Sequence, residues 1–289
     1  MDKKKFRIFI AGAFGIGWIL QIIGSILARQ GSQLGFTLLL TLAMYAPFIA
    51  TLIAKIPVKG MGWKPKLKGK VRFCLAAWLL PGVFTILGGI LYYIIFPNRL
   101  DLTGQYLTMQ AGEAAMQQLE ALGITVSMYL AIMTVPIFTY VPFINMFAAL
   151  GEEVGWRGAM QPMLNDYFGK SKGRVIGGII WGAWHWPAMI IAGYEYGLEY
   201  WGAPFLGMVL FCLITTVMCI LLDVAYEKTK CIWIPSLAHG AINASAALPM
   251  MFLNVEYVNQ MILGPAPVGI ISVLPALCFA VWVLLRNKD

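Results

Sequence analysis

Charged residues are scarce in this chain. Only 12% of its 289 residues are Asp, Glu, Lys or Arg, whereas a soluble domain usually carries about 25%. Hydrophobic residues make up 60%, and the mean hydropathy is +0.76. This composition excludes an ordinary water-soluble domain and predicts a protein whose main solvent is lipid.

Cysteines are few and follow no metal-binding or disulfide pattern. The five cysteines form no CxxC pair, so neither a disulfide framework nor a thiolate zinc site is indicated. The net charge of +8 comes from loops scattered between apolar stretches. A nucleic-acid-binding protein would need a contiguous basic face, so we expect no nucleic-acid partner.

Apolar stretches long enough to cross a bilayer are what the chain has in abundance. A spanning helix needs about 20 mostly apolar residues. Eight stretches qualify: Phe6–Leu27, Leu34–Ala54, Phe73–Phe96, Thr125–Asn165, Val175–Ala192, Ala203–Leu222, Ile234–Leu253 and Pro265–Leu285. We predict an all-α, polytopic transmembrane bundle of about eight helices, forming a single domain over residues 1–289 in contact with membrane lipids.

The basic residues predict the orientation, because Lys and Arg near short loops stay in the cytoplasm. With a cytoplasmic N-terminus, only Arg29 and Arg99 fall outside, and the even number of spans returns the C-terminus to the cytoplasm. The predicted cytoplasmic basic residues are Lys3, Lys4, Lys5, Arg7, those from Lys55 to Arg72, Lys170, Lys172, Arg174, Lys228, Lys230, Arg286 and Lys288. The chain is thus expected in the cell membrane as a multi-pass protein. The external stretch Gln105–Leu122 fits either a surface helix or a mobile loop.

Ionisable residues inside the apolar stretches are the main functional signal, since each costs roughly 2.5–3.5 kcal/mol on insertion scales. Glu152, Glu153 and Arg157 lie in the fourth stretch, and the only two histidines, His185 and His239, lie in the fifth and seventh. This set could hydrogen-bond helices together, or it could supply acid–base chemistry. Five such groups in one region favour chemistry.

Helical spacing separates the roles of the two glutamates. Residues four apart share a face, so Glu153 and Arg157 are predicted to form an ion pair, while Glu152 points about 100° away and remains available for catalysis. By the same spacing Trp181 shares a face with His185, and His239 with Asn243. The histidines lie eleven residues beyond Arg174 and nine beyond Lys230, about 13–17 Å along their helices. We therefore expect the helices to meet around one cavity.

Three short motifs carry a resemblance to a known family. The sequence has Glu152-Glu153-Val154-Gly155-Trp156-Arg157, Trp181-Gly182-Ala183-Trp184-His185 and His239-Gly240-Ala241-Ile242-Asn243. In order and spacing they resemble the EExxxR, FxxxH and HxxxN motifs of the CAAX-prenyl-protease and bacteriocin-processing (CPBP) intramembrane proteases. The motif-bearing region is 125–253. Trp181 departs from the pattern, because the family usually has Phe there.

The resemblance implies an intramembrane peptidase open toward the cytoplasm, acting on a peptide or membrane protein. It implies that Glu152 and His185 activate water, that His239 and Asn243 form the oxyanion hole, and that Glu153 and Arg157 support them. HExxH, GxGD and GxSG motifs, which mark other intramembrane proteases, are missing. Two other classes stay open: a proton-coupled transporter using the same groups as a relay, and a non-catalytic scaffold or bacteriocin-immunity protein.

A metal is the remaining question for this set. Glu152, His185 and His239 could hold zinc with water as fourth ligand. Asn243 is a poor zinc ligand but a good oxyanion donor. We also expect no carboxylate to orient either imidazole as metal sites usually require, since Arg157 would already occupy Glu153. We therefore predict catalysis without a cofactor, with zinc as the alternative.

Overall fold

A computed structural model describes residues 2–65 and 68–286, so the predicted cytoplasmic charges of Lys66 and Lys288 lie outside the described residues. The described residues form helices and no strand; Leu100 and Leu253 make a single bridge. The all-helical prediction is confirmed. The helices are α1 (Lys3–Arg29), α2 (Gln33–Ala43), α3 (Ala46–Ile53), α4 (Val71–Ile95), η1 (Pro97–Arg99), α5 (Gln105–Ala111), α6 (Glu113–Ala121), α7 (Val126–Phe138), α8 (Val141–Glu153), the π-helix η2 (Val154–Met160), α9 (Gln161–Phe168), α10 (Lys170–Trp184), α11 (Trp186–Ala192), α12 (Phe205–Thr229), α13 (Trp233–Ser245), η3 (Pro249–Phe252), η4 (Val255–Leu263) and α14 (Leu274–Arg286).

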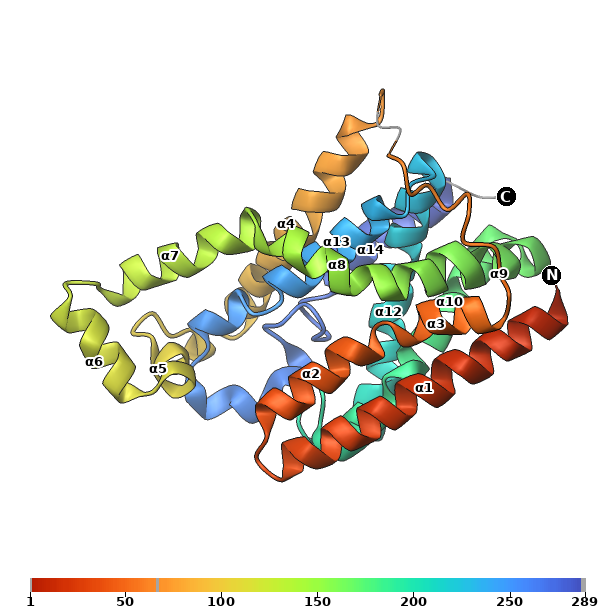
Figure 1. Cartoon of the computed structure of the whole chain (residues 1–289). Coiled ribbons are helices and arrows are strands. Elements are labelled where there is room, and N and C mark those ends of the chain that lie inside the picture. Colours follow the sequence, from red (N-terminus) through yellow and green to blue (C-terminus); the bar gives the residue numbers. More distant parts are fainter. Residues whose placement is uncertain (1, 66–67, 287–289) are drawn as a thin grey trace.

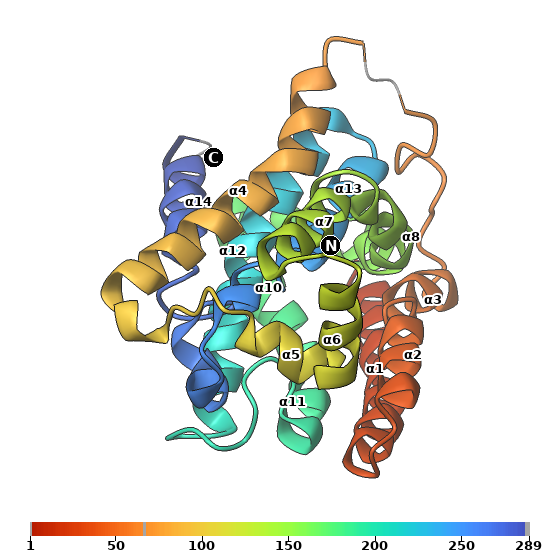
Figure 2. The same ribbon diagram turned by 90° about the vertical axis from the view of Figure 1, so that its left-hand side faces the viewer.

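The helices pack around α10, α12 and α13 (Figures 1 and 2). Helix α13 packs against α8 and α4, and α10 packs along α12. Figure 2 shows α1, α2 and α3 on one side of the bundle, with α4 and α14 on the other. Helices α5, α6 and α7 extend away from the centre, at the left of Figure 1.

Five helices or helix pairs in the described part of the chain are long and apolar enough to cross a membrane. They are Lys3–Arg29, Gln33–Ile53, Val71–Ile95, Lys170–Ala192 and Phe205–Thr229. The pair Glu113–Ala121 and Val126–Phe138 would make a sixth if its 102° bend lies within one span. The protein is therefore a multi-pass membrane protein with fewer full-length spans than the eight apolar stretches suggest.

Interrupted helices account for the difference. The fourth stretch breaks between α7 and α8 at Thr139 (φ −112°, ψ −87°), where Pro136 and Pro142 flank the break and each lacks an N–H for the helical ladder. The seventh stretch stays α-helical only to Ser245 and continues as 3₁₀ turns. The eighth becomes helical only from Leu274. Each leaves a helix of 13 residues, short of the length of a bilayer crossing.

The external stretch Gln105–Leu122 is helical, in agreement with one of its two interpretations. It forms α5 and α6, separated at Gly112, whose φ of +87° lies in the region that glycine adopts most readily. The helical periodicity of the sequence was thus informative. It did not show the turn between the two helices.

Glycines allow α10 to approach α12 closely. A Cβ at Gly178 or Gly182 would collide with the α12 backbone at Thr216 and Cys212. The close approach lets Thr215 Oγ1 donate to the Gly178 carbonyl at 2.9 Å. The contact fixes the position of α10, which carries Trp181 and ends at His185.

Basic segments far apart in sequence meet at one end of the bundle. Lys170 pairs with Glu227 at 2.6 Å, and Lys70 Nζ donates to the Thr229 carbonyl at 2.8 Å. Beneath them Arg174 Nε donates to Asp223 Oδ2 at 2.7 Å, and Asn165 donates to the same oxygen at 3.2 Å; Lys3 lies 5.7 Å from the ring centre of Tyr167. We call this the basic end. Arg29 lies about 40 Å away, at the other end of α1.

Candidate active site

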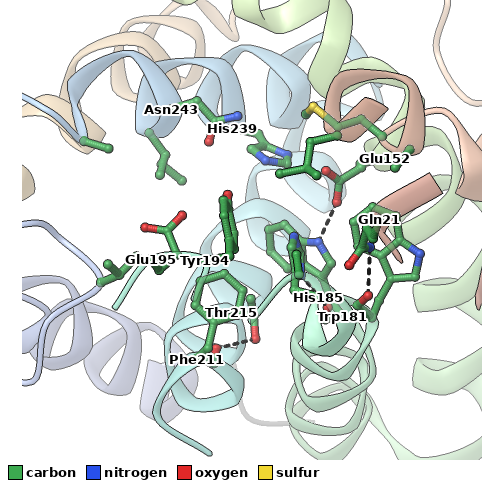
Figure 3. A pocket seen from close by; sticks show the side chains of 18 of the residues that line it. Gln21, Glu152, Trp181, His185, Tyr194, Glu195, Phe211, Thr215, His239 and Asn243 are labelled. Carbon is green, nitrogen blue, oxygen red and sulfur yellow. Dashed lines mark hydrogen bonds between the residues drawn. The ribbon is translucent and has the colours of Figure 1, made fainter. Parts of the chain in front are cut away.

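A cavity of about 310 Å³ lies between α2, α8, α10, α12 and α13 (Figure 3). Its wall contains five of the seven residues singled out from the sequence: Glu152, Trp181, His185, His239 and Asn243. Glu153 and Arg157 are fully buried behind that wall. Helices separated by up to about 90 residues therefore deliver their polar groups to one place.

Glu152 stands near the end of α8, where the chain passes into the π-helix η2. Its Oε2 accepts hydrogen bonds from Trp156 Nε1 at 2.9 Å and Trp181 Nε1 at 2.6 Å. Oε1 makes no hydrogen bond with the described residues. The two indoles hold the carboxylate by one oxygen, and the other oxygen is available to a water or substrate in the cavity.

Glu153 serves two partners at once. Its Oε1 accepts from Arg157 Nη1 at 3.1 Å, which confirms the predicted ion pair, and also from His239 Nδ1 at 2.8 Å. The expectation that Arg157 alone would occupy this carboxylate, leaving neither imidazole oriented by one, is wrong. Helical spacing shows only neighbours on the same helix, whereas His239 reaches Glu153 from α13.

The hydrogen bonds also assign the protons of the imidazoles. His185 Nδ1 lies 3.0 Å from the Trp181 carbonyl, which can only accept, so Nδ1 carries the proton and Nε2 of the neutral ring is a free acceptor. His239 Nδ1 likewise donates to the Glu153 carboxylate. The nearby anion favours the doubly protonated form of His239, in which Nε2 is also a donor.

Trp181 contacts most of the polar groups of the site. Its indole donates to Glu152, and its ring centre lies 5.3 Å from that of His239 and 4.2 Å from the Arg157 guanidinium. Its carbonyl accepts from His185. A Phe at this position, as the family motif usually has, would keep the ring contacts and lose the donor to Glu152.

Asn243 differs from the other site residues in exposure. It follows His239 by one helical turn on α13 and is exposed, whereas His239 is only 4% exposed. Figure 3 shows both on the same side of the cavity. Across the described part of the chain, no group of three or more His, Cys, Asp or Glu side chains is placed to hold a metal ion.

Several residues around the cavity were not singled out from the sequence. Trp156 supports Glu152, Tyr194 stacks on His185 with ring centres 6.1 Å apart and planes 5° apart, and Glu195 places a second carboxylate in the wall. Glu195 belongs to a loop, where periodicity gives no signal. Its flanking sequence, Gly-Tyr-Glu-Tyr-Gly, was the available hint.

The cavity lies in the half of the bundle farther from the basic end. Its wall includes Tyr194 and Glu195, beyond the far end of α11, together with the first half of α12 and most of α2. Toward the basic end the space is filled by buried Arg157 and Met160. A cytoplasmic basic end and a cavity open to the cytoplasm, both expected from the sequence, therefore conflict.

Fold and site together define a class: an all-helical, multi-pass membrane protein with a Glu–His cavity within the bundle. The family resemblance is confirmed over its motif-bearing segment, because residues 134–245 match the family model described as Type II CAAX prenyl endopeptidase Rce1-like. A similar protein is "CAAX prenyl protease 2" of Methanococcus maripaludis, 30% identical over 121 residues. The match covers 38% of this chain and 41% of that relative, so the two align over less than half of their lengths.

Proposed function

We propose that the chain is an intramembrane endopeptidase that hydrolyses a peptide bond of a membrane-associated peptide or membrane protein. The observation that carries the proposal is the arrangement of Glu152 and His185 in one cavity: a carboxylate with one oxygen unbound and an imidazole with a free acceptor nitrogen. Peptide hydrolysis needs such a base to activate water. The match to a CAAX prenyl endopeptidase family supports the same reaction class.

The first step is attack by water on the scissile carbonyl. Glu152 accepts a proton from the water through its unbound oxygen, with His185 Nε2 as a second acceptor for the same water. The resulting hydroxide adds to the carbonyl carbon. Glu152 then returns the proton to the leaving amine, so the protons balance over the reaction.

The second requirement is stabilisation of the oxyanion. His239, held by Glu153 through Nδ1, presents Nε2–H to the cavity when doubly protonated. The Asn243 amide, one helical turn away, is the second donor. Preorganised donors of this kind are worth roughly 10²–10³ in kcat each.

Glu153 and Arg157 are positioning residues in this proposal. Arg157 fixes the Glu153 carboxylate at 3.1 Å, and Glu153 in turn fixes the ring of His239. Neither lines the cavity. No metal takes part in the proposed steps.

The cytoplasmic entrance stays part of the proposal as the family resemblance implies it. It then requires the basic end of the bundle to face outside, against the positive-inside rule. If the basic end is cytoplasmic, as the charges predict, the cavity faces the other side. The labelling experiment described in the Discussion separates the two arrangements.

The test uses the full chain reconstituted in lipid vesicles together with membrane peptides. New peptide termini are identified by mass spectrometry for the wild type, Glu152→Gln and a matched control, Glu120→Gln, which neutralises an exposed carboxylate outside the cavity. Glu152→Gln is expected to lower cleavage by roughly 10²–10⁴-fold, the usual worth of a positioned base, with unchanged expression. Glu120→Gln should cleave like the wild type.

The same vesicles test the rival classes. Cleavage that persists in Glu152→Gln would remove the carboxylate from the mechanism. Solute uptake that depends on Glu152, without any cleavage by the wild type, would identify a transporter. Neither activity in the wild type would favour a non-catalytic scaffold.

A further inference from the structure

The loop after α11 places a second carboxylate in the wall of the catalytic cavity. Helix α11 ends at Ala192, and the chain turns through Gly193 (φ +68°) and Glu195 (φ +70°). Glycine adopts this region readily, but for other L-residues it costs about 1–2 kcal/mol. A strained non-glycine residue beside a catalytic cavity is a candidate for a function.

The two neighbours of Glu195 hold it in place. Tyr194 stacks on His185 and packs edge-on against Phe211, with ring centres 6.2 Å apart. Tyr196 is buried, and its hydroxyl donates to the Val268 carbonyl at 2.7 Å. With both flanking side chains fixed, the carboxylate between them has a defined position.

The charge of the cavity is one-sided. Its lining contains the carboxylates of Glu152 and Glu195 and neither lysine nor arginine. Among the described residues, Glu195 forms no salt bridge. Burial raises the pKa of the Glu195 carboxyl, and hydrogen bonding with Tyr194 partly offsets the effect. A cation entering the cavity would stabilise the ionised form of this group.

Glu195 and the catalytic Glu152 lie at different places around the cavity. In Figure 3, Glu195 is on the same side as Asn243, with Tyr194 between it and His185, and Glu152 is on the opposite side. A peptide whose scissile bond lies between Glu152 and the oxyanion donors would therefore place a neighbouring side chain near Glu195.

We infer that Glu195 is a specificity-determining residue that selects peptides with a basic side chain next to the scissile bond. The inference rests on the proposed peptidase function and names its substrate class. A Lys or Arg side chain pairs with Glu195, whereas an acidic residue or a free C-terminal carboxylate meets two carboxylates and no cation. The pairing contributes to substrate binding, and Glu152 still activates the water.

The experiment begins with a membrane peptide whose cleavage site the wild type defines. Each residue flanking that bond is replaced in turn by Lys, Met or Glu, and kcat/KM is measured in vesicles. The wild type is expected to prefer Lys over Met at one flanking position on the order of tenfold, the effect of one partly buried charge pair, and to disfavour Glu there.

Variants of Glu195 then test the cause. The ratio of kcat/KM for the Lys and Met peptides should fall to near one in Glu195→Gln and remain high in Glu195→Asp, which keeps the charge. In Glu195→Lys the preference should invert toward the Glu peptide. Glu120→Gln should show the wild-type ratios. A ratio compares two peptides within one variant, so a general loss of folding or activity does not alter it.

Three results would overturn the inference. They are equal kcat/KM for Lys and Met peptides in the wild type, a Lys preference that survives in Glu195→Gln, and no inversion in Glu195→Lys. Each can occur while cleavage still depends on Glu152, which leaves the proposed function intact. If the wild type cleaves no peptide, the proposed function fails and the inference fails with it.

Discussion

Replacing Glu153 by Gln removes the charge of a carboxylate that two basic groups share. Arg157 is fully buried, and its Nε and Nη2 have no hydrogen-bond partner among the described residues. Its remaining polar contacts are the Glu153 oxygen at 3.1 Å and the Trp181 ring at 4.2 Å. In Glu153→Gln the guanidinium therefore stays buried without a counterion.

The expected cost follows from that burial. Breaking a buried ion pair by removing one partner typically destabilises by about 3–5 kcal/mol. For a domain of this size, 1 kcal/mol corresponds to roughly 2–4 °C in Tm, so Glu153→Gln should melt on the order of 10 °C below the wild type. Cleavage should also fall, because a neutral Gln no longer favours the doubly protonated form of His239.

A double-mutant cycle separates the two effects. Thermal unfolding in detergent and cleavage in vesicles are measured for Glu153→Gln, Arg157→Gln and the combined variant. Neutralising both partners leaves no buried unpaired charge on this pair, so the combined variant should recover more than half of the lost Tm. Its cleavage should stay low, since the carboxylate beside His239 is still missing.

Two outcomes would refute this reasoning. If Glu153→Gln melts like the wild type, the Arg157 pair does not hold the bundle together. If the combined variant cleaves at the wild-type rate, the Glu153 charge does not act through His239. Glu120→Gln is the matched control for loss of a carboxylate, and it should change neither quantity.

Three further predictions concern the site, its side of the membrane and metals. Trp181→Phe should lower kcat/KM by roughly tenfold or more, because a hydrogen bond to a charged group is worth about 1.5–3 kcal/mol; Trp63→Phe, which removes an indole donor to the Val58 carbonyl outside the site, should not. In a variant without native cysteines, Lys172→Cys at the basic end and Thr37→Cys at the cavity wall should react with an impermeant reagent from opposite sides of the membrane, and reaction from one side would contradict the structural separation; the charges predict Lys172→Cys labelling only in inverted vesicles. A zinc-selective chelator should leave cleavage unchanged, and a loss restored only by zinc would refute the metal-free mechanism.

The sequence was informative about the fold where it depends on composition and local spacing. Apolar stretches predicted an all-helical membrane protein, and the helical face shared by Glu153 and Arg157 predicted their ion pair. The break between α7 and α8 was only partly visible. Pro136 and Pro142 marked the region, but the position of the bend depends on packing against α13 and α4.

The cavity residues were predictable because each motif places its polar residues on one helical face. Contacts between helices were not. Glu153 meets His239 from a position 86 residues away, and Trp156 and Trp181 meet at the same oxygen of Glu152. Such pairs are set by how the helices are rotated against each other, which spacing within one helix does not determine.

The π-helix η2 has a consequence for how this chain tolerates insertions and deletions. Removing one residue from Val154–Met160 could convert the wide turn into an ordinary helix and rotate all that follows by about 100°. Glu152 and Glu153 precede the segment and would keep their places. Asn165 follows it and would turn away from Asp223. Length variation here would thus uncouple the catalytic glutamates from the polar contacts at the basic end, and alignments of related sequences should place no gap within these seven residues.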